Sequence, residues 1–144
     1  MLLNEGLETI GERCFEFSEL GKVTIPGSVR NIGRMAFSKT LLGRVRFRGA
    51  HVRDPSGGSG ESKDSGRERQ LVIGEEAFAD CIGLGQVLFD PDSTVTEIQH
   101  KAFWGAGIES FAAPPSLRKI DALAFGECRE LRTFELNEGT RELG

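Results

Sequence analysis

The apolar residues of this chain recur at fixed spacing. The stretch Val29 to Phe37, V-R-N-I-G-R-M-A-F, has counterparts before and after it, and in each an isoleucine is followed five residues later by a phenylalanine. The pairs are Ile10 with Phe15, Ile32 with Phe37, Ile73 with Phe78, Ile98 with Phe103, and Ile120 with Phe125. Successive pairs are 22, 41, 25 and 22 residues apart. A basic period near 22 residues predicts a solenoid, in which each unit buries its apolar face against the next.

Each unit continues with a short segment that alternates apolar and polar residues. In the first unit Val23 and Ile25 flank Thr24, which is the period of a β-strand, and Pro26 removes a backbone donor and ends the strand. Between the isoleucine and this strand, residues Glu12 to Glu19 suit one or two helical turns. The later units repeat the strand pattern at residues 42–47, 84–89, 108–113 and 131–136.

If each unit forms one coil, equivalent side chains lie one above the other. The five repeat phenylalanines and the five repeat isoleucines then form two ladders, with parallel strands about 4.8 Å apart. Aromatic residues at a fixed repeat spacing are typical of a structural core, and we assign these ten residues to the core rather than to a cofactor site.

One long insertion interrupts the period. Between Phe47 and Ile73 lie 25 residues, where the regular unit has six. Residues Arg53 to Arg69 contain no apolar side chain and are rich in Gly, Ser and charge, so burial cannot offset the entropy of ordering them. We therefore expect one domain over residues 1–144, with about five repeats and a disordered insertion at about 49–69.

The unit resembles a known family. The stretch I-P-G-S-V-R-N-I-G-R-M-A-F, followed by a small residue and then L-x-x-V-x-F, is similar to the BspA-type leucine-rich repeat. The chain departs from the family pattern at Cys14, Gln99, Ala113 and Asp121. The resemblance implies an α/β, right-handed solenoid with a narrow parallel β-sheet on one face and short helices or irregular segments on the other. It also implies protein binding and adhesion at cell surfaces, often in long arrays, and no catalysis.

The strand residues between the buried positions are the candidates for protein binding, because they point to the open face of the sheet. They change from basic in the first two units to small and then acidic in the last. A solvated face without a ligand remains an equal alternative. Trp104 is a further candidate anchor, although packing over the next coil is at least as plausible for it. The candidates are Lys22, Arg44, Arg46, Gln86, Leu88, Ser110 and Trp104.

Composition excludes several other classes of function. The net charge of −4 and the pI near 5.3 give no basic footprint for nucleic acid. No nucleophile, base and orienting acid occur at a recognisable spacing, and no glycine run resembles a phosphate loop, so we expect neither catalysis nor a cofactor. The three cysteines occupy positions of small residues, and we interpret Cys14, Cys81 and Cys128 as buried structural residues rather than metal ligands.

The sequence does not determine the cellular compartment of the protein. The chain has no apolar run of about 18 residues and no signal peptide at its start, so we expect no direct membrane insertion. The resemblance favours a cell surface, whereas unpaired cysteines weakly favour an intracellular scaffold.

Residues 3–11 align with 136–144, and neither end shows a polar cap. We therefore expect either a segment of a longer array or end-to-end self-association. Two hypotheses follow: a non-catalytic module that binds a protein of unknown identity, and a structural segment whose contacts are with further repeats.

Overall fold

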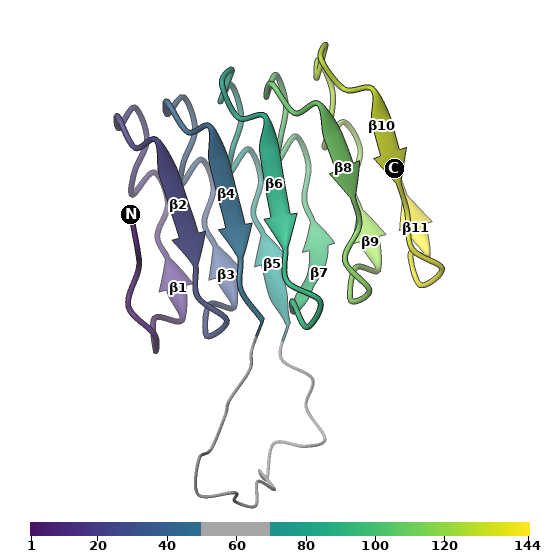
Figure 1. Ribbon diagram of the computed structural model, residues 1–144, viewed down its shortest axis with the longest axis horizontal. Coiled ribbons are helices and arrows are strands. Elements are labelled where there is room, and N and C mark those ends of the chain that lie inside the picture. The colour runs from purple at the N-terminus through teal and green to yellow at the C-terminus, as the bar shows by residue number, and fades with distance from the viewer. Residues whose placement is uncertain (50–69) are drawn as a thin grey trace, which may run out of the picture.

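The computed structural model describes residues 1–49 and 70–144 as a stack of five coils, numbered here 1 to 5 after their phenylalanines Phe15, Phe37, Phe78, Phe103 and Phe125 (Figure 1). The predicted disordered insertion at 49–69 lies, apart from Gly49, outside the described residues. In the described part, each coil passes through one strand at the front and one at the back of the view in Figure 1.

The front strands are parallel and in register. They are β2 (Lys22–Ile25), β4 (Arg44–Phe47) and β6 (Gln86–Phe89), which form a three-stranded sheet, and β8 (Ser110–Ala112) and β10 (Thr133–Glu135), which form a two-stranded one. Lys22 pairs with Arg44, and Arg44 with Gln86. Buried and exposed positions alternate along β4 as the sequence pattern predicts. We call the outward side of these five strands the front face.

A second parallel sheet of six strands forms the back of the stack. Its strands are β1 (Thr9–Ile10), β3 (Asn31–Ile32), β5 (Leu71–Ile73), β7 (Val95–Ile98), β9 (Lys119–Ile120) and β11 (Glu142–Leu143). The repeat isoleucines pair along it, for example Ile10 with Ile32 and Ile32 with Ile73. The prediction of parallel strands is confirmed, but a sheet stands where we expected helices or irregular segments.

The segment between the two strands of a coil is a series of tight turns. In coil 1 the amides of Cys14, Glu16 and Ser18 donate to the carbonyl oxygens three residues earlier, at 3.3, 3.1 and 3.1 Å. The prediction of helical turns at Glu12 to Glu19 is therefore wrong, and the described residues contain no helix. The cause is a left-handed backbone at Arg13 (φ 55°) and Phe17 (φ 64°), which no helix accommodates.

The same two left-handed positions recur in every coil, two residues before and two residues after the phenylalanine. They are Arg13, Phe17, Met35, Lys39, Glu76, Asp80, Lys101, Gly105, Leu123 and Glu127. In coils 1 to 4 the amides of these residues point to the next coil and donate to its carbonyl oxygens, as from Lys39 to Ala79 at 2.9 Å. The amide of the phenylalanine between them does the same, as from Phe37 to Ala77 at 2.7 Å.

The core is a continuous ladder of rings. The five repeat phenylalanines stack with centroids 5.1 to 5.3 Å apart and planes within 12° of parallel. Phe37, Phe78 and Phe103 are fully buried, whereas Phe15 and Phe125 in the end coils are half-buried. Because stacked rings contact only the coils on either side, the core depends on neighbouring coils.

The first prediction concerns this dependence. Phe78→Ala should lower the free energy of unfolding by roughly 3 to 5 kcal/mol, because it removes a buried ring with a stacked neighbour on each side. Phe15→Ala should cost clearly less, because its ring stacks only on Phe37. Urea unfolding followed by circular dichroism compares the two variants. Equal losses would contradict a one-dimensional stack.

Candidate protein-binding surface

Two rows of outward side chains cross the front face. One row consists of Lys22, Arg44 and Gln86 on adjacent strands, and all three are exposed. The second row consists of Thr24, Arg46 and Leu88, where Thr24 is half-buried and the other two are exposed. The residues between the two rows are buried and pack in the core; they are Val23, Val45 and Val87.

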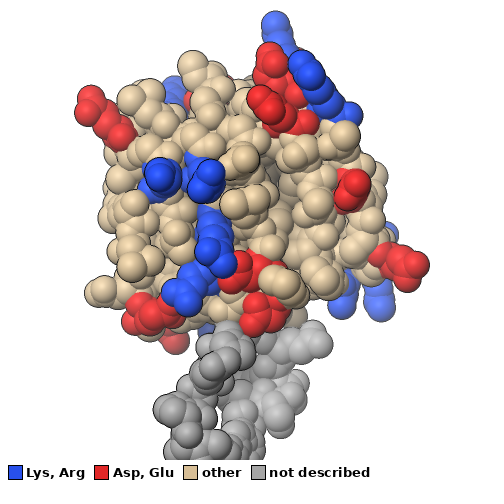
Figure 2. Space-filling model, viewed as in Figure 1, with Lys and Arg blue, Asp and Glu red and all other residues tan. Residues whose placement is uncertain are grey.

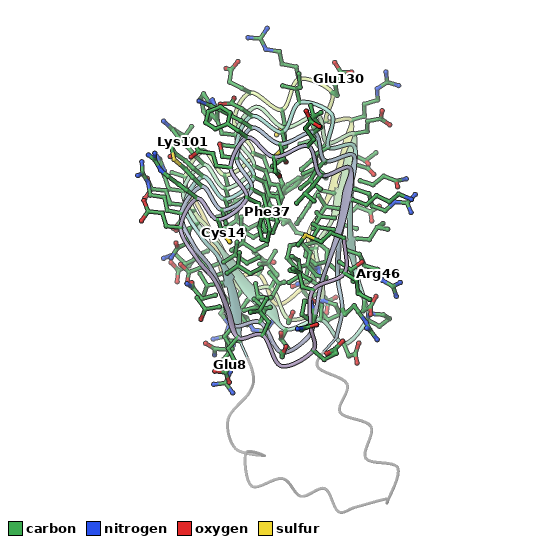
Figure 3. All side chains as sticks on the ribbon, turned by 90° about the vertical axis from the view of Figure 1, so that its left-hand side faces the viewer. Glu8, Cys14, Phe37, Arg46, Lys101 and Glu130 are labelled. Carbon is green, nitrogen blue, oxygen red and sulfur yellow. The ribbon has the colours of Figure 1, made fainter. Side chains whose placement is uncertain are left out.

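The charges of this face are concentrated over β2 and β4 (Figure 2). Arg44 donates from Nε to Oε1 of Gln86 at 2.9 Å, so its partner is neutral. Arg46 donates from Nε to Oδ1 of Asp90, also at 2.9 Å, and forms an ion pair there. Figure 3 shows Arg46 directed away from the core. Lys22 and Arg44 thus form a pair of adjacent cations that no carboxylate of the described residues neutralises.

The other half of the front face differs in chemistry. β8 and β10 present exposed Ser110, Ala112, Thr133 and Glu135. β6 and β8 belong to separate sheets, so the front face is divided between coils 3 and 4. In the described residues the front face therefore changes from basic at coils 1 and 2 to acidic at coil 5.

Trp104 lies elsewhere. Its ring is half-buried and rests on Gly126 of the next coil, where an added Cβ would come within 2.3 Å of Cζ3 of the indole. The ammonium nitrogen of Lys101 lies 5.0 Å from the ring centroid. Lys101 and Arg46 lie on opposite sides of the stack in Figure 3. The structure therefore does not bring Trp104 together with the basic residues of the front face.

The three thiols occupy three environments. Cys81 is buried and donates to the carbonyl oxygen of Phe37 at 3.0 Å, and burial raises its pKa. Cys128 is half-buried, donates to the carbonyl oxygen of Phe103 at 3.1 Å, and has a pKa raised by burial to about 11. Cys14 is exposed, which contradicts our prediction of a buried residue. It occupies the position of buried Ala36, but no described coil covers the outer side of coil 1.

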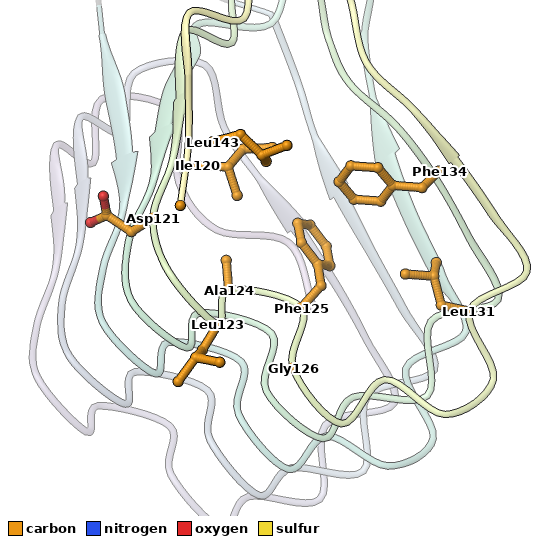
Figure 4. A pocket seen from close by; sticks show the side chains of 10 residues that line it. Ile120, Asp121, Leu123, Ala124, Phe125, Gly126, Leu131, Phe134 and Leu143 are labelled. Atoms are coloured by element: carbon orange, nitrogen blue, oxygen red, sulfur yellow. The ribbon is translucent and has the colours of Figure 1, made fainter.

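The end coils expose apolar side chains. A hollow of about 310 Å³ lies on coil 5 between Ile120, Phe125, Leu131 and Phe134 (Figure 4). Phe134 is 38% exposed, whereas its equivalent in coil 4, Phe111, is buried. In coil 1 Phe15 is only half-buried, whereas Phe37 in coil 2 is fully buried. The ladder positions that are closed in the central coils are therefore partly open in the first and last described coils.

Neither a metal centre nor a membrane span is found in the described residues. Within 1–49 and 70–144, no three His, Cys, Asp or Glu side chains group closely enough to hold a metal ion. The same ranges contain no helix of the length and apolar character that crossing a membrane requires.

Sequence reasoning missed two features. Asp90 binds Arg46, and its position directly after β6 could have indicated this, because a residue at a strand end lies beside the neighbouring strand. Gly105 and Gly107 leave a hollow beside Trp104. The sequence signal for this hollow was the occurrence of two glycines where the two neighbouring coils carry Asp80 and Ile82, and Glu127 and Arg129.

The repeat unit and the stacked coils define a leucine-rich repeat solenoid. The sequence pattern described as the BspA type leucine rich repeat region, with six copies, matches residues 1–53 and 67–144. The chain belongs to this family, which confirms the resemblance seen in the sequence.

One solved structure agrees with the fold, and two others align less closely. A leucine-rich repeat protein from Bacteroides ovatus ATCC 8483 aligns with 99% of this chain and 32% of its own, at 23% identity and a TM-score of 0.70. This chain thus spans about a third of that protein. The pneumococcal vaccine antigen PcpA aligns with 93% of this chain and 25% of its own, at 15% identity and a TM-score of 0.49. A leucine rich cell surface protein from Faecalibacterium prausnitzii A2-165 aligns with 90% of this chain and 43% of its own, at 22% identity and a TM-score of 0.42. No curated protein matches the chain.

The second prediction concerns the thiols. Iodoacetamide at mildly alkaline pH should modify Cys14 first, because it is exposed. Cys128 should react slowly, since a pKa of about 11 leaves little thiolate, and Cys81 should react only on unfolding. Mass spectrometry of digests taken over time gives the order. Early modification of Cys81 in the folded chain would contradict its burial.

Proposed function

We propose that this chain is a non-catalytic module that binds a protein partner through the front face of coils 1 to 3. The observation that supports the proposal most is the pair of adjacent cations, Lys22 and Arg44, with exposed Leu88 on the strand next to Arg44. Like charges on neighbouring strands repel each other, so a partner carboxylate placed between them is favourable in two ways.

The chemistry of the surface favours an acidic partner segment with an apolar side chain. Leu88 is 42% exposed and lies in register with Arg46, so it offers an apolar contact on the strand beside Arg44. Asp90 already neutralises Arg46, which leaves Lys22 and Arg44 as the charges available to a partner. Adhesion at a cell surface is the form of binding that the family resemblance implies, and it is part of this proposal.

A structural segment of a longer array is the second candidate. The hollow on coil 5 favours it, because Phe125 there lacks the stacked ring that Phe37, Phe78 and Phe103 each have on both sides. In this case the contacts of the chain are with further repeats rather than with a foreign partner.

The third prediction tests the first candidate. Lys22→Glu combined with Arg44→Glu reverses the free cations and leaves the Arg46–Asp90 ion pair intact. Proteins captured by the wild-type chain and identified by mass spectrometry should be lost with this double variant, because attraction becomes repulsion. They should also dissociate at high salt.

The matched control is Arg30→Glu combined with Arg141→Glu, which changes the net charge equally at two exposed residues off the front face. It should retain the captured partner. Loss with both double variants, or with neither, would contradict the assignment of the front face, provided that circular dichroism shows all chains folded.

The fourth prediction tests the second candidate. Sedimentation of the isolated chain over a wide concentration range should show association, and Phe134→Glu should abolish it, because a charge would then occupy the rim of the hollow. A monomer at every concentration would count against end-to-end contact between copies of this chain.

A further inference from the structure

A hollow opens on the turn edge of coil 4, away from the front face. The two positions that follow the repeat phenylalanine by two and four residues carry Asp80 and Ile82 in coil 3, and Glu127 and Arg129 in coil 5. In coil 4 both are glycines. The missing side chains leave a hollow of about 380 Å³ between coils 3 and 5. Because neighbouring parallel strands are about 4.8 Å apart, the backbones of coils 3 and 5 lie roughly 10 Å from each other. This distance leaves room for one side chain between them.

The two glycines have different roles. Gly107 is required by packing, since an added Cβ would lie 2.2 Å from the carbonyl oxygen of Ile82. Gly105 has φ +69°, but its equivalents Lys39, Asp80 and Glu127 adopt a similar backbone with a side chain. Backbone conformation therefore does not require glycine at 105, and the main consequence of Gly105 is the open space.

One part of the hollow is apolar. Ile82 is 77% exposed on one wall, and the half-buried ring of Trp104 lines the same hollow. Trp104 is the only tryptophan of the chain. An exposed isoleucine next to an indole offers a surface for the methylene groups of a long side chain.

The other lining groups are mainly acidic. The carboxylate of Asp80 lies over Gly105, where an added Cβ would come within 2.7 Å of its Oδ1. Within the described residues neither the carboxylate of Asp80 nor that of Glu130 has a hydrogen-bond or ion-pair partner, whereas the carboxylate of Glu127 accepts from Arg129 at 2.8 Å. The lining therefore contains three carboxylates and one guanidinium, and two of the three carboxylates have no partner among the described residues.

We propose that this hollow binds an arginine side chain of a partner protein. The guanidinium suits the unpaired carboxylates of Asp80 and Glu130, because its planar fork donates two parallel hydrogen bonds to one carboxylate. The methylene stem lies against Ile82 and Trp104. This contact uses residues that the front face does not include, so it stands or fails independently of the function proposed above.

The test uses the full chain and the blocked peptide acetyl-Gly-Arg-Gly-amide. Its analogues with glutamate or norleucine in place of arginine serve as comparisons. The single indole N–H of Trp104 and the amides of Gly105 and Gly107 report binding by NMR. The arginine peptide should shift these three signals in a saturable manner, and both analogues should shift them far less.

Variants of the hollow give the matched comparison. Asp80→Asn with Glu130→Gln should weaken binding at least about threefold, because both unpaired charges are removed. Asn tolerates the left-handed backbone at position 80. Gly105→Asn should block the hollow. The control, Glu8→Gln with Glu135→Gln, removes two exposed charges elsewhere and should bind as the wild type does; Glu8 and Glu130 lie at opposite ends of the coil in Figure 3.

Three results would overturn the proposal. One is the absence of shifts with the arginine peptide up to tens of millimolar. Another is an equal response to the norleucine peptide, which would show apolar contact without charge recognition. The third is equal weakening by the control variant, which would show attraction to the net charge of the chain alone.

Discussion

Backbone hydrogen bonds between successive coils are the interaction on which the rest of this structure depends. In the turns, the amides of Met35, Phe37 and Lys39 all donate to coil 3, and the strands on both sides of the stack pair in the same direction. A left-handed residue costs roughly 1–2 kcal/mol. Each inter-coil bond made at such a position returns about 1 kcal/mol. The unusual backbone therefore persists because the neighbouring coil binds it, and the ring ladder follows from the same stacking.

The sequence predicted the features that recur in every unit, but it did not predict the features that depend on contacts with the adjacent coil. The Ile–Phe spacing predicted the parallel stack, because buried apolar residues recur only if equivalent positions are buried. The helical turns were wrong because Arg13 and Phe17 carry no sequence mark of a left-handed backbone, which in glycine-poor turns is imposed by hydrogen bonds to the next coil. The prediction that Cys14 is buried was also wrong: the equivalent alanines of the other four coils are buried, Ala124 of the last coil included, whereas Cys14 of the first coil is exposed.

The candidate site was predictable in part. Alternation along the strands correctly placed Lys22, Arg44 and Arg46 on an exposed surface, since a strand directs every second side chain outward. Their pairing was not predictable, because Asp90 reaches Arg46 from a different coil, 44 residues later. Whether the front face binds a protein depends on this pairing, which determines how many cations remain free.

In this repeat protein, some positions of the unit serve stability and others are available for recognition. Positions that face the next coil accept little change, as Gly107 shows, where a single added carbon would meet the backbone of coil 3. Positions that face solvent vary freely, and at one of them the chain has Lys39, Asp80, Gly105 and Glu127 on the same backbone. Because the hydrogen bonds of the stack involve only backbone atoms there, the surface can change charge and shape from coil to coil without altering the fold. Deviations from the repeat at exposed positions are therefore where binding specificity in this chain can arise, and the hollow of coil 4 is one such deviation.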